Sequence, residues 1–90
     1  NLLGTQFNNE MAHTITLYPN PSQEKVTVES TLNGLENIKV YSIDGSLLKD
    51  IKNVGNNMFT MDISAYSNGI YFVKITLEDG FLITKKILRN

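Results

Sequence analysis

The amino-acid sequence predicts an all-β protein, an antiparallel β-sandwich of about seven short strands. Apolar and polar residues alternate with a period of two along most of the chain, as in strands that bury one face. Turn residues interrupt this alternation roughly every 8–12 residues, which is typical of immunoglobulin-like or fibronectin-like sandwiches. No long segment shows the 3.6-residue period of an amphipathic helix, and we expect only residues 64–67 to form a single helical turn.

The first half of the chain is expected to contain three strands. Ile15 and Leu17 alternate with polar residues and lead into Pro19 and Pro21. Because proline cannot donate a hydrogen bond to a central ladder, this strand should lie at a sheet edge or end there. The next two strands have inward apolar pairs, Val26 with Val28 and Ile38 with Val40.

Four more strands are expected in the second half. Leu47, Leu48 and Ile51 indicate the fourth strand, which ends at a turn formed by Gly55, Asn56 and Asn57, and Phe59, Met61 and Ile63 indicate the fifth. In the sixth strand Tyr71, Val73, Ile75 and Leu77 should share the buried face. The last strand should cover residues 81–89, where apolar and polar residues again alternate.

Two Asp-Gly pairs are expected to close tight hairpins. Asp44-Gly45 follows the third strand, and Asp79-Gly80 lies between the last two strands. A type I′ turn needs positive φ at both central residues, and Asp-Gly is one of the sequences that favour it. We therefore expect a type I′ hairpin at Asp44-Gly45 and a tight turn at Asp79-Gly80.

Composition limits the possible functions. The 90 residues are 41% hydrophobic and 19% charged, which is ordinary for one globular domain. The formal net charge of −1 provides no overall field to attract nucleic acid. The absence of cysteine excludes a disulfide framework and a thiolate metal site. No apolar run approaches the ~20 residues of a transmembrane helix. We therefore expect neither a nucleic-acid partner nor a transmembrane segment.

The sequence contains no recognisable catalytic or metal-binding set. His13 is the only histidine and has no second histidine or cysteine with which to share a metal. The acidic residues are spread over turns and outer faces, where solvated roles explain them better than an acid–base pair. The serines lack a plausible general base because the only imidazole lies near the start of the chain. We therefore expect no enzymatic activity, no cofactor and no small-molecule substrate.

The aromatic residues leave two interpretations open. They could form a sugar-stacking platform, although packing in the core and on the sheet faces is the simpler interpretation. The residues concerned are the seven aromatics of the expected sandwich, Tyr18, Tyr41, Tyr66, Tyr71, Phe59, Phe72 and Phe81. Tyr71, at the start of the penultimate strand, is also placed to form a tyrosine corner that bonds back to the preceding loop.

Four short segments, taken in order, carry a family resemblance. They are Tyr18-Pro19-Asn20-Pro21, the stretch from Ile38 to Gly45, the stretch from Asp62 through Gly69-Ile70-Tyr71 to Lys74, and Lys85-Lys86-Ile87 near the last residue. Together they resemble the type A C-terminal sorting domain of the type IX secretion system of Bacteroidetes. The resemblance covers about residues 14–90 and implies an immunoglobulin-like fold.

The resemblance also implies a function. Members of this family are non-catalytic tails of larger exported proteins, which first cross the inner membrane by an N-terminal signal. The folded tail is then recognised by the outer-membrane type IX translocon, and a sortase-like peptidase usually removes it. The implied partners are this translocon, the peptidase and an upstream cargo domain in the same precursor. The implied location is the cell surface or the medium, reached through the periplasm.

The resemblance assigns candidate recognition residues. The Pro-Asn-Pro motif of the family falls on Pro19, Asn20 and Pro21, and its Gly-x-Tyr motif on Gly69 and Tyr71. Its terminal lysine motif falls on Lys85 or Lys86. We expect the last strand to offer a free edge to which a partner strand could add. The same lysines could instead protect the edge against aggregation, and both roles can hold together.

Residues 1–13 lack the alternation of the remaining chain and are expected to be a linker or cleavage region that follows the cargo domain. Residues 14–90 are expected to be the sorting domain. Because the chain opens on asparagine, we also expect it to be a fragment of a longer precursor. The alternative function is a carbohydrate-binding or purely structural β-sandwich module appended to a secreted enzyme.

Overall fold

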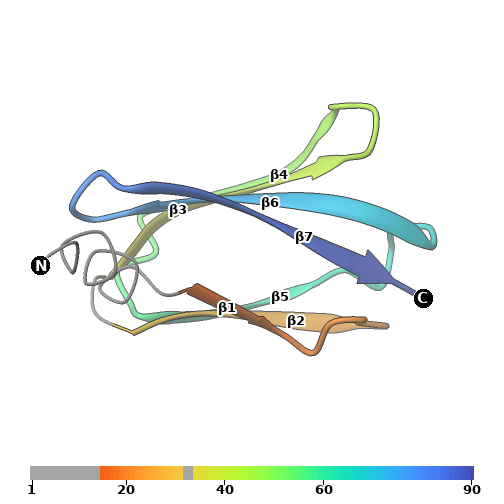
Figure 1. The fold of residues 1–90 in the computed structure, drawn as a ribbon, viewed down its shortest axis with the longest axis horizontal. Coiled ribbons are helices and arrows are strands. Elements are labelled where there is room, and N and C mark those ends of the chain that lie inside the picture. Colours follow the sequence, from red (N-terminus) through yellow and green to blue (C-terminus); the bar gives the residue numbers. More distant parts are fainter. Residues whose placement is uncertain (1–14, 32–33) are drawn as a thin grey trace, which may run out of the picture.

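The computed structural model describes residues 15–31 and 34–90, which form two antiparallel sheets packed face to face (Figure 1). The predicted boundary between residues 13 and 14 lies outside the described residues. The seven strands are β1 (Ile15–Tyr18), β2 (Lys25–Ser30), β3 (Leu35–Ser42), β4 (Leu47–Lys52), β5 (Met58–Asp62), β6 (Gly69–Leu77) and β7 (Leu82–Arg89).

One sheet has the strand order β1-β2-β5, and the other has the order β4-β3-β6-β7. Every strand pair is antiparallel. The predicted immunoglobulin-like antiparallel β-sandwich of about seven strands is therefore confirmed. β1 is an edge strand, as its two following prolines predicted, and it lies on the same side of the sandwich as the edge strand β7.

The core lies between the sheets and follows the period-two pattern of the sequence. β6 shows it most clearly, because Tyr71, Val73, Ile75 and Leu77 are all buried, as predicted. β2, β3 and β5 contribute Val26, Val28, Leu35, Ile38, Val40 and Met61, and Ile63, which directly follows β5, is buried as well. Complete burial of such side chains contributes about 1.5–3 kcal/mol each, so this alternating set stabilises the sandwich.

Both predicted hairpins form, but their turns are not type I′. Gly45 has φ of 93°, whereas Asp44 is not among the residues with positive φ. The N–H of Gly45 donates to Ser42 O at 3.0 Å, and the N–H of Ser42 donates to Ser46 O at 2.9 Å. This is a three-residue loop with glycine in the left-handed position. The reason is local, because Oδ1 of Asp44 accepts the N–H of Ser46 and keeps the aspartate in a right-handed turn.

The Asp79-Gly80 hairpin repeats this geometry. Gly80 has φ of 90°, and its N–H donates to Leu77 O at 2.9 Å. The N–H of Leu77 donates to Phe81 O at 2.9 Å, and Asp79 Oδ1 accepts the N–H of Phe81 at 3.0 Å. The prediction of a hairpin was correct at both sites, and the type I′ turn predicted at Asp44-Gly45 was wrong.

The single helical turn expected at residues 64–67 is also wrong. This segment is a β-turn in which the N–H of Tyr66 donates to Ile63 O at 3.0 Å. Asp62 Oδ1 accepts the N–H of Ser64 at 2.9 Å, so the aspartate side chain closes the turn directly after β5. The described residues contain no helix.

Candidate functional site

The Pro-Asn-Pro segment, which follows β1, lies against the far end of the chain. Asn20 Oδ1 accepts the main-chain N–H of Leu88 at 3.0 Å, and its Nδ2 donates to Lys86 O at 3.2 Å. The side-chain amide thus pairs with the outer edge of β7 as a neighbouring strand would. The peptide bonds before Pro19 and Pro21 are both cis. All three side chains of the motif are exposed, and its two hydrogen bonds hold Asn20 against β7.

Ser22 continues this contact with its main chain. Its N–H donates to Leu88 O at 2.8 Å, and the N–H of Asn90 donates to Ser22 O at 3.0 Å. Ser22 forms a parallel bridge with Arg89 and is buried, and its hydroxyl donates to Pro19 O. The expectation that the last strand offers a free edge is therefore wrong at residues 86–90, where Asn20 and Ser22 cover the edge.

The Gly-x-Tyr motif lies on the other side of the same strand. Gly69 is the register partner of Arg89, and Tyr71 is the partner of Ile87. The Tyr71 hydroxyl donates to Ser67 O at 2.5 Å, which confirms the predicted tyrosine corner. The ring of Tyr66 packs on that of Tyr71 with centroids 5.2 Å apart. The two motifs therefore flank β7, one on each side.

Arg89 joins this strand to the β5–β6 loop. Its Nε donates to Ile63 O at 3.1 Å, one terminal nitrogen to Ser64 O at 3.0 Å and the other to Asn68 Oδ1 at 2.7 Å. The planar guanidinium suits several simultaneous acceptors, which a lysine cannot match. None of the family motifs in the sequence includes Arg89. A sequence signal was present, because it is the only arginine among eight basic residues.

Lys85 and Lys86 lie on opposite faces of the sheet. Lys85 is the register partner of the buried Val73, so it stands on the core side of the edge strand and still reaches solvent. Lys86 is the partner of Phe72 and stands on the outer side. An inward-facing lysine on an edge strand is a known protection against edge-to-edge pairing. The two lysines therefore meet different surroundings, although they are neighbours in sequence.

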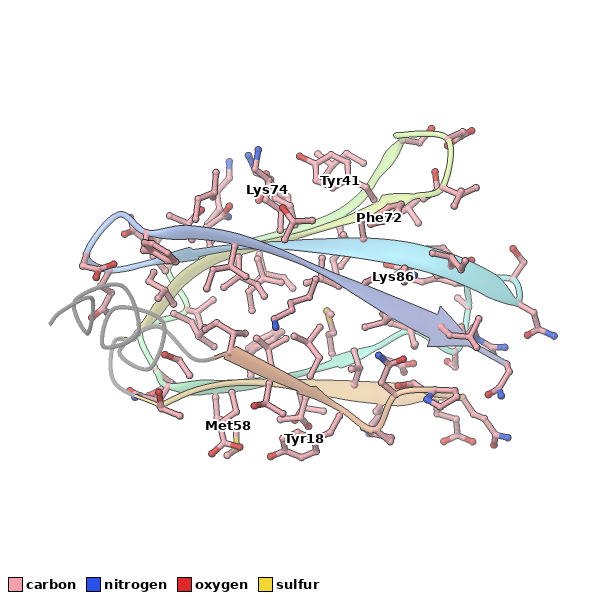
Figure 2. All side chains as sticks on the ribbon, in the orientation of Figure 1. Tyr18, Tyr41, Met58, Phe72, Lys74 and Lys86 are labelled. Carbon is pink, nitrogen blue, oxygen red and sulfur yellow. The ribbon has the colours of Figure 1, made fainter. Side chains whose placement is uncertain are left out.

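The aromatic residues do not form one exposed row. Tyr71 is buried with 6% exposure, whereas Tyr41 and Phe72 are register partners and half-buried. Figure 2 shows Tyr41, Phe72 and Lys74 on the outer side of the four-stranded sheet, and Tyr18 and Met58 outside the other sheet. A sugar platform requires an exposed row of aromatic side chains on one sheet face, and of Tyr41, Tyr71 and Phe72 only Tyr71 is fully removed from such a row.

The titration of Tyr18 and Asp62 reflects local hydrogen bonds. The Tyr18 hydroxyl donates to Glu29 at 3.1 Å, and this bond, with slight burial and the carboxylate charge, raises the pKa of Tyr18. The hydroxyl and N–H of Ser64 lower the pKa of Asp62. In the part of the chain that the structure describes, no three His, Cys, Asp or Glu side chains gather as a metal site, and no helix is long and apolar enough to cross a membrane. His13 lies outside that part.

Comparison with known proteins shows which family the chain matches. The family described as "Secretion system C-terminal sorting domain" matches residues 16–90, which include all seven strands except the first residue of β1. No curated protein matches the chain. Because the family match covers most of the sequence, the chain belongs to the C-terminal sorting domains of the type IX secretion system.

Proposed function

We propose that this domain directs a larger precursor from the periplasm across the outer membrane, and that the translocon reads the folded surface around β7. The observation that carries this proposal is the convergence of the motifs on one strand. Asn20 bonds to residues 86 and 88, and Gly69 and Tyr71 pair with Arg89 and Ile87. Segments far apart in sequence thus meet on the two sides of β7 and together shape the surface around this strand.

Such a surface exists only in the folded domain. The Asn20–Leu88 bond joins positions 68 residues apart, and the Arg89 contacts span 21–26 residues. An unfolded chain would present the same motifs without their mutual arrangement. We infer that the translocon distinguishes folded from unfolded tails through this arrangement, and that Pro19, Asn20, Pro21, Gly69, Tyr71, Lys85 and Lys86 form or support the recognised surface.

Removal of the domain is the second part of the proposal. A sortase-like peptidase would cut within or before residues 1–13, which lack the alternation of the sandwich. The cargo would then remain at the cell surface or enter the medium. The domain itself supplies no chemistry in this scheme and acts as a non-catalytic address.

A fusion experiment tests the export role. Residues 1–90 are joined to a reporter that a separate signal delivers to the periplasm of a type IX-competent host. The fusion should reach the surface or the medium, whereas the reporter alone and the fusion in a translocon-deficient host should stay periplasmic. A wild-type fusion that stays periplasmic in the competent host would refute the proposed function. A structural spacer would give that same periplasmic result.

A lysine pair tests the involvement of the last strand. Lys85→Ala/Lys86→Ala should leave the fold intact, because exposed substitutions usually change stability by no more than about 0.5 kcal/mol. The variant fusion should accumulate in the periplasm. Lys25→Ala/Lys52→Ala removes the same charge elsewhere and is the matched control. If the Lys85/Lys86 variant is exported like the wild type, the lysines do not belong to the recognised surface.

A further inference from the structure

The outer face of the four-stranded sheet carries apolar residues in register across its strands. Leu47 of β4 pairs with Tyr41 of β3, which pairs with Phe72 of β6, which in turn pairs with Lys86 of β7. Ile70 and Leu88 form the next pair towards the same end and are both exposed. Contiguous apolar surface of this kind marks an interaction site more often than solitary exposed residues do.

The β3–β4 hairpin extends this surface away from the body of the sandwich (Figure 1). Ile43 in its turn is 67% exposed, and Leu47 and Leu48 directly after the turn are 50% and 41% exposed. Five of the nine large hydrophobic residues that are well exposed in the described structure therefore lie at this end, namely Ile43, Leu47, Leu48, Ile70 and Leu88.

Lysines border the apolar residues on the same face. Lys39 and Lys74 are direct register partners, and Lys86 stands beside Phe72. Like charges directly opposite each other disfavour strand pairing. Among the described residues, none of these three lysines forms an ion pair. The Lys39–Lys74 pair therefore disfavours strand pairing, and no ion pair to either lysine offsets this among the described residues.

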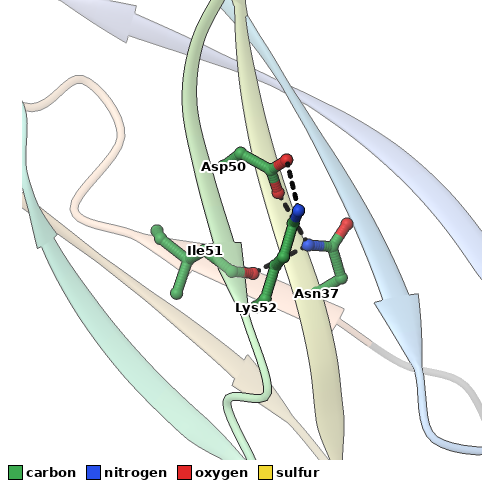
Figure 3. A network of polar contacts seen from close by, with 4 residues as sticks. All are labelled: Asn37, Asp50, Ile51 and Lys52. Carbon is green, nitrogen blue, oxygen red and sulfur yellow. Dashed lines mark hydrogen bonds and ion pairs between the residues drawn. The ribbon is translucent and has the colours of Figure 1, made fainter.

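The nearby carboxylate of Asp50 does not neutralise the positive charge of Lys39, Lys74 and Lys86. Asp50 is the register partner of Lys39, but its carboxylate accepts from Asn37 Nδ2 at 2.9 Å and lies 3.8 Å from Lys52 Nζ (Figure 3). Asn37 Nδ2 also donates to Ile51 O at 2.8 Å, which fixes this cluster at the β3–β4 side. Positive charge therefore remains over β3, β6 and β7.

We propose that this face, defined by Tyr41, Leu47, Phe72, Lys39, Lys74 and Lys86, is the docking surface for an apolar protein surface bordered by carboxylates. The inference rests on the proposed sorting function and assigns this partner surface to the export machinery. Charge complementarity selects the partner, because three unpaired lysines around apolar side chains match carboxylates around an apolar patch.

A protein surface fits better than an anionic membrane. Asp44 lies at the tip of the hairpin between the exposed apolar residues. Hydrogen bonds from Ser42 and Ser46 lower the pKa of this carboxyl, so it stays ionised at neutral pH. A fixed negative charge at the most protruding point opposes insertion among anionic headgroups. A protein partner can accommodate the same carboxylate with a donor.

Lys74→Glu is the sharpest test, because its effects on folding and on docking have opposite signs. The new glutamate would stand opposite Lys39, so the melting temperature should stay equal or rise. Export of the reporter fusion should nevertheless fall about tenfold, since a rim charge has been reversed. Lys25→Glu makes the same charge change on the other sheet, opposite Asp62, and should export normally despite its less favourable pairing.

Leu47→Ser and Met58→Ser form a matched apolar pair, because the two side chains are 50% and 48% exposed on the two opposite sheets. Only Leu47→Ser should reduce export. If the wild-type fusion is exported and both Lys74→Glu and Leu47→Ser are exported equally well, this inference fails while the sorting function stands. If the purified domain co-sediments with vesicles of phosphatidylserine and phosphatidylcholine and Lys74→Glu abolishes this, the partner is a membrane and the inference is overturned.

Discussion

The main-chain N–H of Leu88 donates to Oδ1 of Asn20 at 3.0 Å and joins the first connection of the sandwich to its last strand. The other end of the same amide donates to Lys86 O. One side chain thereby satisfies two main-chain groups on the edge of β7. The contact also crosses between the sheets, because Asn20 follows β1 of one sheet and β7 belongs to the other.

Asn20→Ala should destabilise the domain by about 1 kcal/mol, because it removes two hydrogen bonds to the last strand. Urea unfolding measures the change, and hydrogen exchange at the Leu88 amide should become faster. Asn20→Asp is the matched variant, since it keeps an acceptor for Leu88 but places an oxygen against Lys86 O. Unchanged exchange at Leu88 in Asn20→Ala would contradict this account.

Arg89→Ala should cost about 1.5–3 kcal/mol, because it removes charge-assisted bonds to three acceptors in the β5–β6 loop. Arg89→Lys should recover only part of the lost stability, since an ammonium group cannot reach all three acceptors as the planar guanidinium does. Lys86→Ala, on the same strand, should change the free energy of unfolding by no more than about 0.5 kcal/mol. Equal losses in Arg89→Ala and Lys86→Ala would show that the loop contacts contribute nothing.

Tyr71→Phe should cost about 1 kcal/mol, because it removes only the hydroxyl that donates to Ser67 O and leaves the ring in the core. Thermal unfolding measures the loss. Tyr41→Phe is the control, since Tyr41 has a half-buried ring on the outer face. A Tyr71→Phe domain as stable as the wild type would exclude a stabilising tyrosine corner.

Val73→Asp should destabilise the sandwich by several kcal/mol, because it places a carboxylate at a fully buried position of β6, where the only oppositely charged register partner is Lys85 on the exposed edge strand. Thr84→Asp introduces the same group at an exposed position of β7 and should change stability by no more than about 0.5 kcal/mol. Melting temperatures of the two variants give the comparison. An unchanged value for Val73→Asp would show that its side chain does not face the core.

Asp44 should titrate below the ordinary aspartate range of about 3.9, because the Ser42 hydroxyl and the Ser46 N–H bond to its carboxylate. Because the pKa is lower in the folded state, these bonds stabilise the hairpin fully at pH values above the unfolded pKa. The stabilisation is lost as the pH falls through the folded pKa. Carboxyl NMR titration measures this directly. Ser42→Ala should move the pKa of Asp44 back towards the ordinary value, and an unmoved pKa would contradict the assigned cause.

Much of the fold could be predicted from the sequence, because its strands are encoded locally. Val26 and Val28 in β2, and Val73 and Ile75 in β6, alternate with polar residues, and this pattern identifies both the strands and their buried faces. The turn types could not be predicted in the same way. Asp44 and Asp79 bond to the main chain two residues ahead, which favours a right-handed turn over the type I′ alternative.

The sequence by itself determined the all-β class, the core faces and the motifs that identify the family, since period-two patterns and turn residues act over a few positions. Only the tertiary structure decided that Asn20 covers the edge of β7 and that Arg89 holds the β5–β6 loop. It also decided that Lys85 faces the core side while Lys86 faces outward. These contacts depend on the order of strands in two sheets, which brings distant segments together and which no local pattern specifies.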